Sequence, residues 1–132
     1  MAKAAGNNAN FLLNIGPMPT GEIQPEFIER LQGMGNWLSK YGEAFYGTRG
    51  GPLSPRPWGV TTQKGNKIYV HILDWPDDTI AIPAVSKRIK SIRSLRNSKP
   101  VRYEQNKYGL LMSIPKDARD EYDTIIEIEL GN

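Results

Sequence analysis

Two different periods of apolar residues divide the chain. Residues 11–15 are apolar apart from Asn14, and such a run predicts a strand that is buried on both faces. After a loop rich in proline and glycine, apolar residues recur at spacings of three and four over residues 25–41, which predicts one amphipathic α-helix. The apolar stripe of this helix consists of Phe27, Ile28, Leu31, Met34, Leu38 and Tyr41.

Two glycines stand inside the predicted helix. Gly33 and Gly35 each cost a helix about 1 kcal/mol compared with alanine. We therefore expect a neighbouring backbone to pass close to the helix there. The apolar stripe also needs a cover, because burying such side chains is a main source of stability. We expect the β part of the chain, or another copy of the chain, to cover it.

Beyond residue 57 the apolar period changes to two, which is typical of strands. The predicted strands are rich in β-branched and aromatic residues and cover residues 60–62, 67–73, 79–82, 89–95, 101–103, 110–114 and 124–130. The first two form a hairpin. Residues 89–95 also fit helical spacing, but Pro83 and Pro100 limit a helix there. The series predicts an antiparallel β-sandwich or barrel.

These patterns predict a mainly β fold with one α-helix, divided into four regions. Residues 1–10 form a flexible N-terminal segment and residues 11–47 a strand-loop-helix unit. Residues 48–57 contain three prolines and two glycines and form a linker, and residues 58–132 form the β domain. Parallel sheets need several βα units, so the single unit here has either lost its neighbours or folds back onto the β domain.

The composition excludes several kinds of functional site. The 132 residues suffice for one ordinary domain, and the absence of cysteine excludes disulfides, thiolate zinc sites and cysteine nucleophiles. His71 is the single histidine, so no site can use two imidazoles from this chain. No apolar run reaches the roughly 20 residues of a membrane span, and no signal sequence is apparent, so we expect a soluble chain without an export signal. The compartment stays unknown.

Positive charge is concentrated in residues 86–107. The chain carries a net charge of +3, and this basic block contains eight cations and one acid, Glu104. The cations are Lys87, Arg88, Lys90, Arg93, Arg96, Lys99, Arg102 and Lys107. They could bind nucleic acid or an acidic glycan. Apolar residues interrupt the block. We therefore expect the cations to lie on the outer face of strands, where they keep strand edges soluble, rather than to bind nucleic acid.

Five short motifs carry a resemblance to a known family. They are residues 10–17 (NFLLNIGP), 21–23 (GEI), 29–31 (ERL), 35–38 (GNWL) and 42–48 (GEAFYGT). In this order they closely resemble the α-L-fucosidases of glycoside hydrolase family 29, and a weaker similarity continues to the end of the chain. The resemblance implies that residues 11–47 are the last strand and helix of a (β/α)₈-like barrel. It also implies that residues 58–132 are the β-sandwich that follows the barrel.

The family resemblance implies a retaining hydrolase that removes terminal α-L-fucose with an aspartate nucleophile and a carboxylate acid/base. In the family both lie before the NFLLNIGP motif, and no position here matches either of them. We therefore assign no catalytic, substrate-binding, metal or cofactor residues and expect the chain alone to be inactive. The expected partner is the catalytic barrel, or a second copy, with carbohydrate bound only through a parent enzyme that is periplasmic, secreted or lysosomal. The alternatives are an independent carbohydrate-binding module or an anion-binding β domain.

The remaining polar candidates favour structural roles. The turn carboxylates are expected to be solvated and to accept backbone hydrogen bonds: Asp74, Asp77, Asp78, Asp120, Glu121 and Asp123. Acids near the start of the helix are expected to interact with its dipole: Glu22, Glu26 and Glu29. Asn14 and the adjacent Gly16-Pro17 would lie at the rim of a sugar pocket in a complete barrel. For Asn14 we favour structural hydrogen bonding over a substrate role.

His71 and the aromatic residues have two interpretations each. Strand alternation places His71 opposite Val70 and Ile72, where a structural or surface role is favoured over metal binding. Six aromatic residues could form a platform for sugars: Trp58, Tyr69, Trp75, Tyr103, Tyr108 and Tyr122. We favour core or interdomain packing for them.

Overall fold

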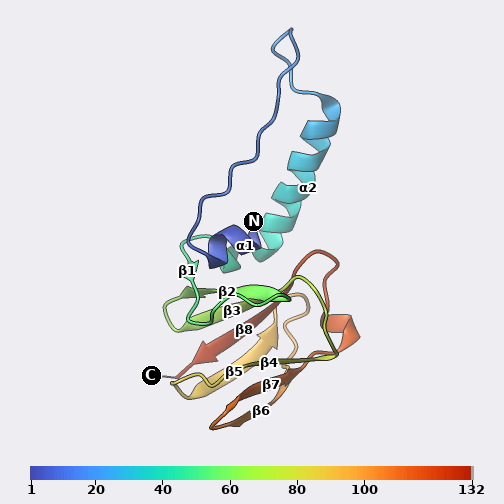
Figure 1. Cartoon of the computed structure of the whole chain (residues 1–132). Coiled ribbons are helices and arrows are strands. Elements are labelled where there is room, and N and C mark those ends of the chain that lie inside the picture. Colours follow the sequence, from blue (N-terminus) through green and yellow to red (C-terminus); the bar gives the residue numbers. More distant parts are fainter. Residues whose placement is uncertain (132) are drawn as a thin grey trace.

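The computed structural model describes residues 1–131, which form a two-sheet β-sandwich with a helical extension (Figure 1). The five-stranded sheet has the order β1-β2-β3-β8-β5, and its strands are β1 (Arg49–Gly50), β2 (Gly59–Lys64), β3 (Lys67–Ile72), β8 (Thr124–Leu130) and β5 (Ile89–Ser94). The three-stranded sheet has the order β4-β7-β6, and its strands are β4 (Thr79–Pro83), β7 (Gly109–Ser113) and β6 (Arg102–Asn106). All pairings within the sheets are antiparallel. The mainly antiparallel β fold predicted from the sequence is confirmed.

The core lies between the two sheets. Ile68, Val70 and Ile72 alternate along β3 and point toward the second sheet, where they meet Ile80 and Met112. All are at most 1% exposed. Strand side chains alternate between the two faces of a sheet, so every second residue of each strand points into the space between the sheets. The sandwich therefore has a complete core of its own.

The opposite face of the five-stranded sheet carries polar and aromatic groups. Tyr69 and His71 on β3, with Ile125 and Glu127 on β8, are each at most 2% exposed although they lie outside the sandwich core. Tyr69, His71 and Ile125 are covered where the 3₁₀ turn η1 (Gly42–Ala44), Phe45 after it and the end of α2 meet the sheet. Glu127 lies between Lys67 and Arg93 on the neighbouring strands. This face is where the helical part is attached.

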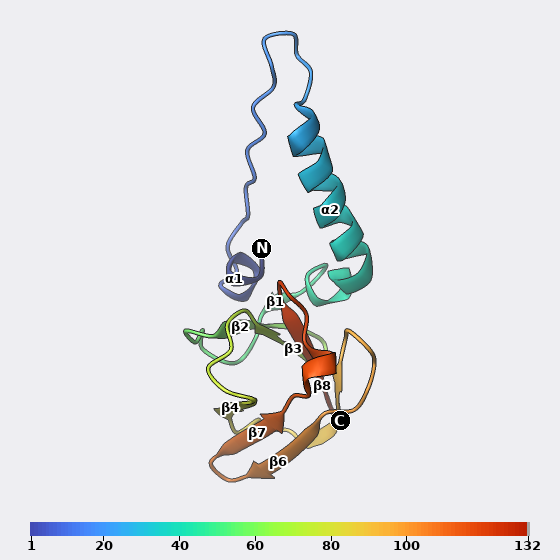
Figure 2. The same ribbon diagram turned by 90° about the vertical axis from the view of Figure 1, so that its right-hand side faces the viewer.

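The helical part projects away from the sandwich (Figures 1 and 2). We call residues 9–41 the arm: an extended segment runs outward, turns, and returns as α2 (Pro25–Tyr41). Within α2 only Tyr41 is buried, and Ile28 and Leu31 are 42% and 37% exposed. The expectation that the apolar stripe packs against the β part is therefore wrong, except at the last turn of the helix. No helix among residues 1–131 is long and apolar enough to cross a membrane.

Three local predictions differ from the structure. Residues 11–15 are not assigned as a strand, because no backbone hydrogen bond joins residues 10–17 to another segment within the described chain. Residues 2–6, expected to be flexible, form the short helix α1 (Ala2–Gly6), which packs on β2. The expected linker 48–57 begins with β1, which pairs with β2. The 3₁₀ turn η2 (Lys116–Ala118) was not anticipated. Residues 89–94 form the strand β5 rather than a helix.

Candidate functional site at the junction of arm and sandwich

A buried hydrogen-bond chain ties the arm to the sheet. The Thr62 hydroxyl on β2 donates to the Ala44 carbonyl oxygen of η1 at 2.7 Å. Its oxygen lies 3.0 Å from Nε2 of His71 on β3, and Nδ1 of His71 lies 2.7 Å from Oδ2 of Asp123. Thr62 and His71 are fully buried and Asp123 is 4% exposed. Buried polar groups paired in this way fix one geometry, because breaking a bond would leave an unsatisfied partner.

The donors and acceptors of this hydrogen-bond chain fix where its protons lie. Thr62 has one hydroxyl hydrogen, which goes to Ala44, so its oxygen accepts the Nε2 proton of His71. A second proton lies between Nδ1 of His71 and Oδ2 of Asp123. Burial raises the pKa of Asp123, and the hydrogen bond from His71 opposes that effect. The His71–Asp123 pair thus holds two protons and carries no net charge.

Aromatic rings pack around His71 at the same junction. Trp37 lies 4.8 Å from Tyr41 and 5.6 Å from Phe45 between ring centroids, and Phe45 meets the His71 ring edge-on at 5.0 Å. The Tyr41 hydroxyl donates to Asp120 Oδ2 at 2.9 Å. Such edge-on and tilted ring pairs add to the stabilisation that burial provides. The end of α2 is therefore fixed to the sandwich by apolar as well as polar contacts.

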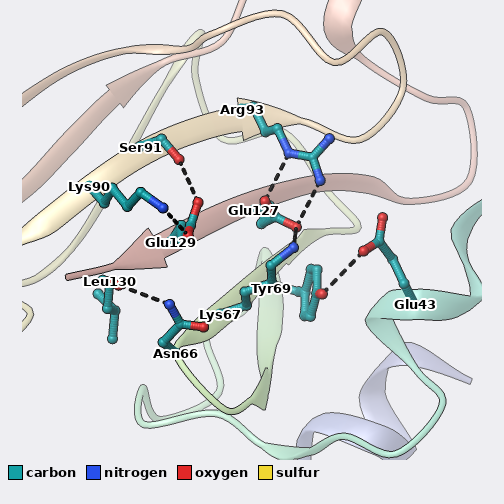
Figure 3. A network of polar contacts seen from close by, with 10 residues as sticks. All are labelled: Glu43, Asn66, Lys67, Tyr69, Lys90, Ser91, Arg93, Glu127, Glu129 and Leu130. Carbon is teal, nitrogen blue, oxygen red and sulfur yellow. Dashed lines mark hydrogen bonds and ion pairs between the residues drawn. The ribbon is translucent and has the colours of Figure 1, made fainter. Parts of the chain in front are cut away.

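A second polar network crosses the sheet beside this junction (Figure 3). Arg93 on β5 binds Glu127 with two nitrogens at 2.8 and 3.0 Å, and Lys67 on β3 binds it at 3.0 Å. Burial acts to raise the pKa of Glu127, but the two cations outweigh it and hold that pKa below its ordinary value. Burial, aided by the charges of Glu43 and Glu127, raises the pKa of Tyr69 to about 12. The Tyr69 hydroxyl accordingly stays protonated and donates to Glu43 of η1 at 3.4 Å.

A cleft opens between α1, α2 and the start of β8. Its volume is about 650 Å³. Apolar lining comes from Met34, Trp37, Phe45, Leu73 and Tyr122, and polar lining from residues such as Glu29, Arg30, Asn36 and Asp123. Asp123 Oδ1 is buried and has no hydrogen-bond partner within the described residues, and unsatisfied buried atoms of this kind are rare in complete structures. Burial acts to raise the pKa of Asp120, but hydrogen bonds from the Tyr122 amide, the Tyr41 hydroxyl and the buried indole N–H of Trp37 hold that pKa below its ordinary value.

The turn carboxylates behave in two ways. Asp74 and Asp77 are exposed and accept backbone hydrogen bonds, as expected, while Asp78 pairs with Arg119 at 2.6 Å. Asp123 was expected to be solvated, and this was wrong: it is buried against His71. The pair joins positions 52 residues apart, so no local spacing could have revealed it.

The other predicted candidates lie apart from the junction. Asn14, Gly16 and Pro17 are exposed on the extended segment of the arm, and Glu22 and Glu26 are exposed near the start of α2. Glu121 is exposed in the turn before β8. Glu29, Asp120 and Asp123 are the candidate carboxylates that the structure brings to the junction.

Half of the basic block is neutralised or bound within the chain. Lys90 pairs with Glu129 at 2.7 Å, Lys99 with Asp117 at 2.9 Å and Arg93 with Glu127, and Arg96 donates to the Arg119 carbonyl oxygen. The cations thus lie along strands and turns.

The aromatic residues do not form one platform. Trp58 and Trp75 pack against the sandwich core and Tyr69 is buried, which agrees with the packing interpretation. Tyr103, Tyr108 and Tyr122 are 41%, 79% and 72% exposed and come from β6, the β6–β7 turn and the turn before β8.

The carboxylates of the junction are engaged within the chain. Asp123 and Glu127 are the carboxylates buried among residues 1–131, and each is bound to a basic side chain. No group of three or more potential metal ligands occurs in this part of the chain. The cleft, by contrast, is lined by the apolar side chains of Met34, Trp37 and Phe45.

The comparisons with known proteins give one consistent result. The family model described as alpha-L-fucosidase matches residues 1–43. The tissue alpha-L-fucosidase of Macaca fascicularis is 35% identical over 121 residues, which cover 81% of this chain and 24% of that protein. The alpha-L-fucosidase of Branchiostoma floridae is 38% identical over 99 residues, covering 65% of this chain and 20% of that protein. The chain thus spans about a fifth to a quarter of the length of these curated relatives.

The similarity extends to the three-dimensional structure. Alpha-L-fucosidase isoenzyme 1 from Paenibacillus thiaminolyticus superposes with a TM-score of 0.86 at 34% identity, over 99% of this chain and 33% of that chain. Both the arm and the sandwich therefore have counterparts, in the same relative placement, within a chain about three times as long.

Proposed function

Since the chain belongs to the α-L-fucosidase family and corresponds to part of such an enzyme, we propose that it is a non-catalytic portion that completes and braces a catalytic portion. In this proposal the arm supplies surface that the catalytic portion covers, and the sandwich holds the arm in place. The complete protein would then remove terminal α-L-fucose by hydrolysis.

One observation carries the proposal: a firmly anchored arm with an uncovered apolar surface. Of the eleven large hydrophobic residues that are exposed within residues 1–131, six lie in residues 11–31. They are Phe11, Leu12, Leu13, Ile23, Ile28 and Leu31. Exposed apolar side chains concentrated in one segment in this way mark an interaction site. The Paenibacillus thiaminolyticus enzyme has two thirds of its chain outside the superposed region, which is ample to cover such a surface.

The carboxylates support the non-catalytic role. A retaining glycosidase needs two carboxyl groups about 5–5.5 Å apart, one ionised and one protonated, facing the sugar. Asp123 and Glu127 are instead buried and bound to basic side chains, and the turn carboxylates Asp74, Asp77 and Asp78 are exposed at the surface. We expect no α-L-fucosidase activity from the chain alone.

The test replaces the matching third of a relative with this chain. A chimera would join the catalytic portion of the Paenibacillus thiaminolyticus enzyme to this chain in place of the superposed third. We expect the chimera to hydrolyse an aryl α-L-fucoside, and the isolated chain to show no turnover. An inactive chimera, or turnover by the isolated chain that is lost on substituting one of its own carboxylates, would contradict the proposal.

A matched pair of variants locates the contact. Leu31→Asp in the arm should abolish the activity of the chimera, because it places a charge in the covered surface. Tyr108→Asp, in an exposed turn of the sandwich, should leave it unchanged. If the isolated chain sediments as a dimer that Leu31→Asp dissociates, the partner is a second copy instead.

A further inference from the structure

The hydrogen bonds of His71 determine how many protons the junction holds. Nε2 carries a hydrogen, because the Thr62 oxygen that it meets at 3.0 Å has given its own hydrogen to Ala44. Nδ1 lies 2.7 Å from Oδ2 of Asp123, a distance typical of a charge-assisted hydrogen bond, which requires a second hydrogen between the two atoms. The folded pair therefore holds one proton more than a neutral imidazole and an ionised carboxylate do when they are separate.

Opening the junction to water would change this count. Histidine and aspartate in solvent ordinarily titrate near pH 6.5 and near pH 3.9, so above about pH 6.5 the separated groups hold no extra proton. In the folded chain, loss of the proton would leave a buried carboxylate facing the lone pair of Nδ1, since His71 is fully buried and Asp123 is 4% exposed. Burial also raises the pKa of Asp123, which acts in the same direction. The closed junction therefore keeps this proton to a higher pH than the open junction.

The pair lies where the arm is attached, outside the core between the two sheets. Phe45 packs edge-on against the His71 ring, and Trp37 packs on Phe45. Thr62 connects the same ring to the Ala44 carbonyl oxygen. These residues are absent from the cluster that forms the sandwich core among residues 1–131. Loss of the proton should therefore weaken the attachment of the arm and leave the sandwich folded.

Other charged or titratable groups reach the junction from each neighbouring element. They are the Met1 amino group before α1, Glu29, Arg30 and Tyr41 on α2, Glu43 on η1, Tyr69 on β3, and Asp120 and Glu127 before and on β8. Burial raises the pKa of both tyrosines, whereas partners that outweigh burial hold the pKa of Asp120 and of Glu127 below its ordinary value. These four groups therefore keep their charge near neutral pH.

We propose that the His71–Asp123 pair is a proton-dependent latch, which holds η1 and the end of α2 on the sheet in mildly acidic solution and releases them as the pH rises above neutral. Each opening event then transfers one proton to water. The equilibrium constant for opening should accordingly rise about tenfold for each pH unit above about 6.5, until the closed pair also loses its proton. The latch acts within this chain and needs no catalytic portion.

Amide hydrogen exchange in the complete chain measures the opening. The Met1 amino group is acetylated, so that its charge plays no part. Between about pH 6.5 and 8.5, protection factors corrected for the intrinsic effect of pH should fall about tenfold per pH unit for the amides of Phe45 and Tyr46, which donate to the Gly42 carbonyl oxygen. The protection factors of Leu110 and Met112, on β7 of the sandwich, should not change with pH.

Asp123→Asn tests the proton itself. Its NH₂ group can donate to Nδ1, so His71 keeps both hydrogen bonds as a neutral ring and the folded pair holds no extra proton. The protection of η1 should then be level above about pH 6.5 and fall about tenfold per unit below it, because an exposed histidine takes up a proton on opening. Glu121→Gln, at an exposed carboxylate of the same turn, is the control and should keep the wild-type profile.

The ring of His71 gives an independent measurement, because the chain has a single histidine and its ring signals are unambiguous. The nuclear magnetic resonance signal of the Nδ1 hydrogen should persist at about pH 7.5, where an exposed histidine has lost that proton. Its loss near pH 6.5 would overturn the latch even if Asp123→Asn does not fold. So would wild-type protection of η1 that is constant with pH, an equal fall of protection in β7, or a wild-type profile in Asp123→Asn.

Discussion

The sandwich and the arm differ in how their apolar residues are used. In the sandwich, Val70, Met112, Ile126 and Ile128 are completely buried between two sheets of the same chain. In the arm, Leu12 is 92% exposed and α2 buries only its last residue, Tyr41. The apolar patterns of both regions predict that their apolar side chains are buried. The sandwich finds its partner surface within residues 1–131, and the arm does not.

This difference shows that an apolar pattern can predict burial without saying which part of a protein provides the cover. The arm keeps its shape because its two ends are fixed: Asn8 accepts a hydrogen bond from the Gly50 amide at 2.7 Å, and Tyr41 donates to Asp120. Between those ends little holds it. We therefore expect substitutions to have opposite consequences in the two regions of the isolated chain.

The largest expected contrast is between Ile126→Asp and Leu31→Asp. A charge at Ile126 would lie in the sandwich core, at a cost of about 5 kcal/mol or more, and should abolish cooperative unfolding in urea. Leu31 is already partly in water, so Leu31→Asp should change the free energy of unfolding of the isolated chain by less than about 0.5 kcal/mol. A similar loss of unfolding free energy in both variants would refute the contrast between the sandwich and the arm.

His71→Ala should have the next largest effect. It leaves the buried Asp123 carboxylate without its basic partner, which costs about 3–5 kcal/mol. Lys99→Ala, which removes an exposed ion pair with Asp117, should cost about 1 kcal/mol or less. Urea unfolding measures both, and hydrogen exchange should show that His71→Ala also loosens η1. Equal, small effects would mean that the junction network contributes little.

The pH dependence of stability should identify Glu127. Because its pKa is lower in the folded than in the unfolded chain, Glu127 stabilises the fold above its ordinary pKa of 4.5, and this contribution is lost as the pH falls below that value. Glu127→Gln should cost about 1.5–3 kcal/mol near neutral pH and flatten the acid limb of the stability curve. Glu26→Gln, on the exposed arm, serves as the control. A Glu127→Gln curve parallel to that of the wild type would contradict this assignment.

The smallest expected effect has the opposite sign. Gly35→Ala adds a Cβ that meets nothing within 4 Å and should stabilise α2 of the isolated chain by about 0.5–1 kcal/mol. At Gly59 in β2, an added Cβ would collide with the His71 carbonyl, so Gly59→Ala should destabilise the sandwich. Circular dichroism for the helix and urea unfolding for the sandwich distinguish the two. A loss of helix in Gly35→Ala would show that the arm is already covered in the isolated chain.

The strands of the sandwich could be predicted because alternation is a local property. Residues 67–73 and 124–130 alternate between core and junction faces, so both strands were recognised within a residue or two. The helix α1 was missed because five residues, Ala-Lys-Ala-Ala-Gly, are too few to display a helical period. The strand predicted at 11–15 failed for a different reason: a strand needs a neighbour, and its apolar character implies contacts outside the described chain.

The junction could be predicted only in part. Alternation placed His71 on the face away from the core, which the structure confirms. Its partners Thr62 and Asp123 come from another strand and from a distant turn, and nothing in their local sequence distinguishes them from solvated residues. Such pairs depend on the register between β2, β3 and β8, which periodicity alone does not specify.

The position of β8 has a consequence for how the sandwich is made. This strand follows all other strands in the sequence, yet it lies between β3 and β5 in the five-stranded sheet. A ribosome therefore synthesises β1 to β7 before the strand that joins β3 to β5 exists. Closing that sheet depends on contacts between distant residues, which slows folding. Until then the apolar edges of β3 and β5 stay unpaired, and a growing chain would need protection from aggregation at those edges.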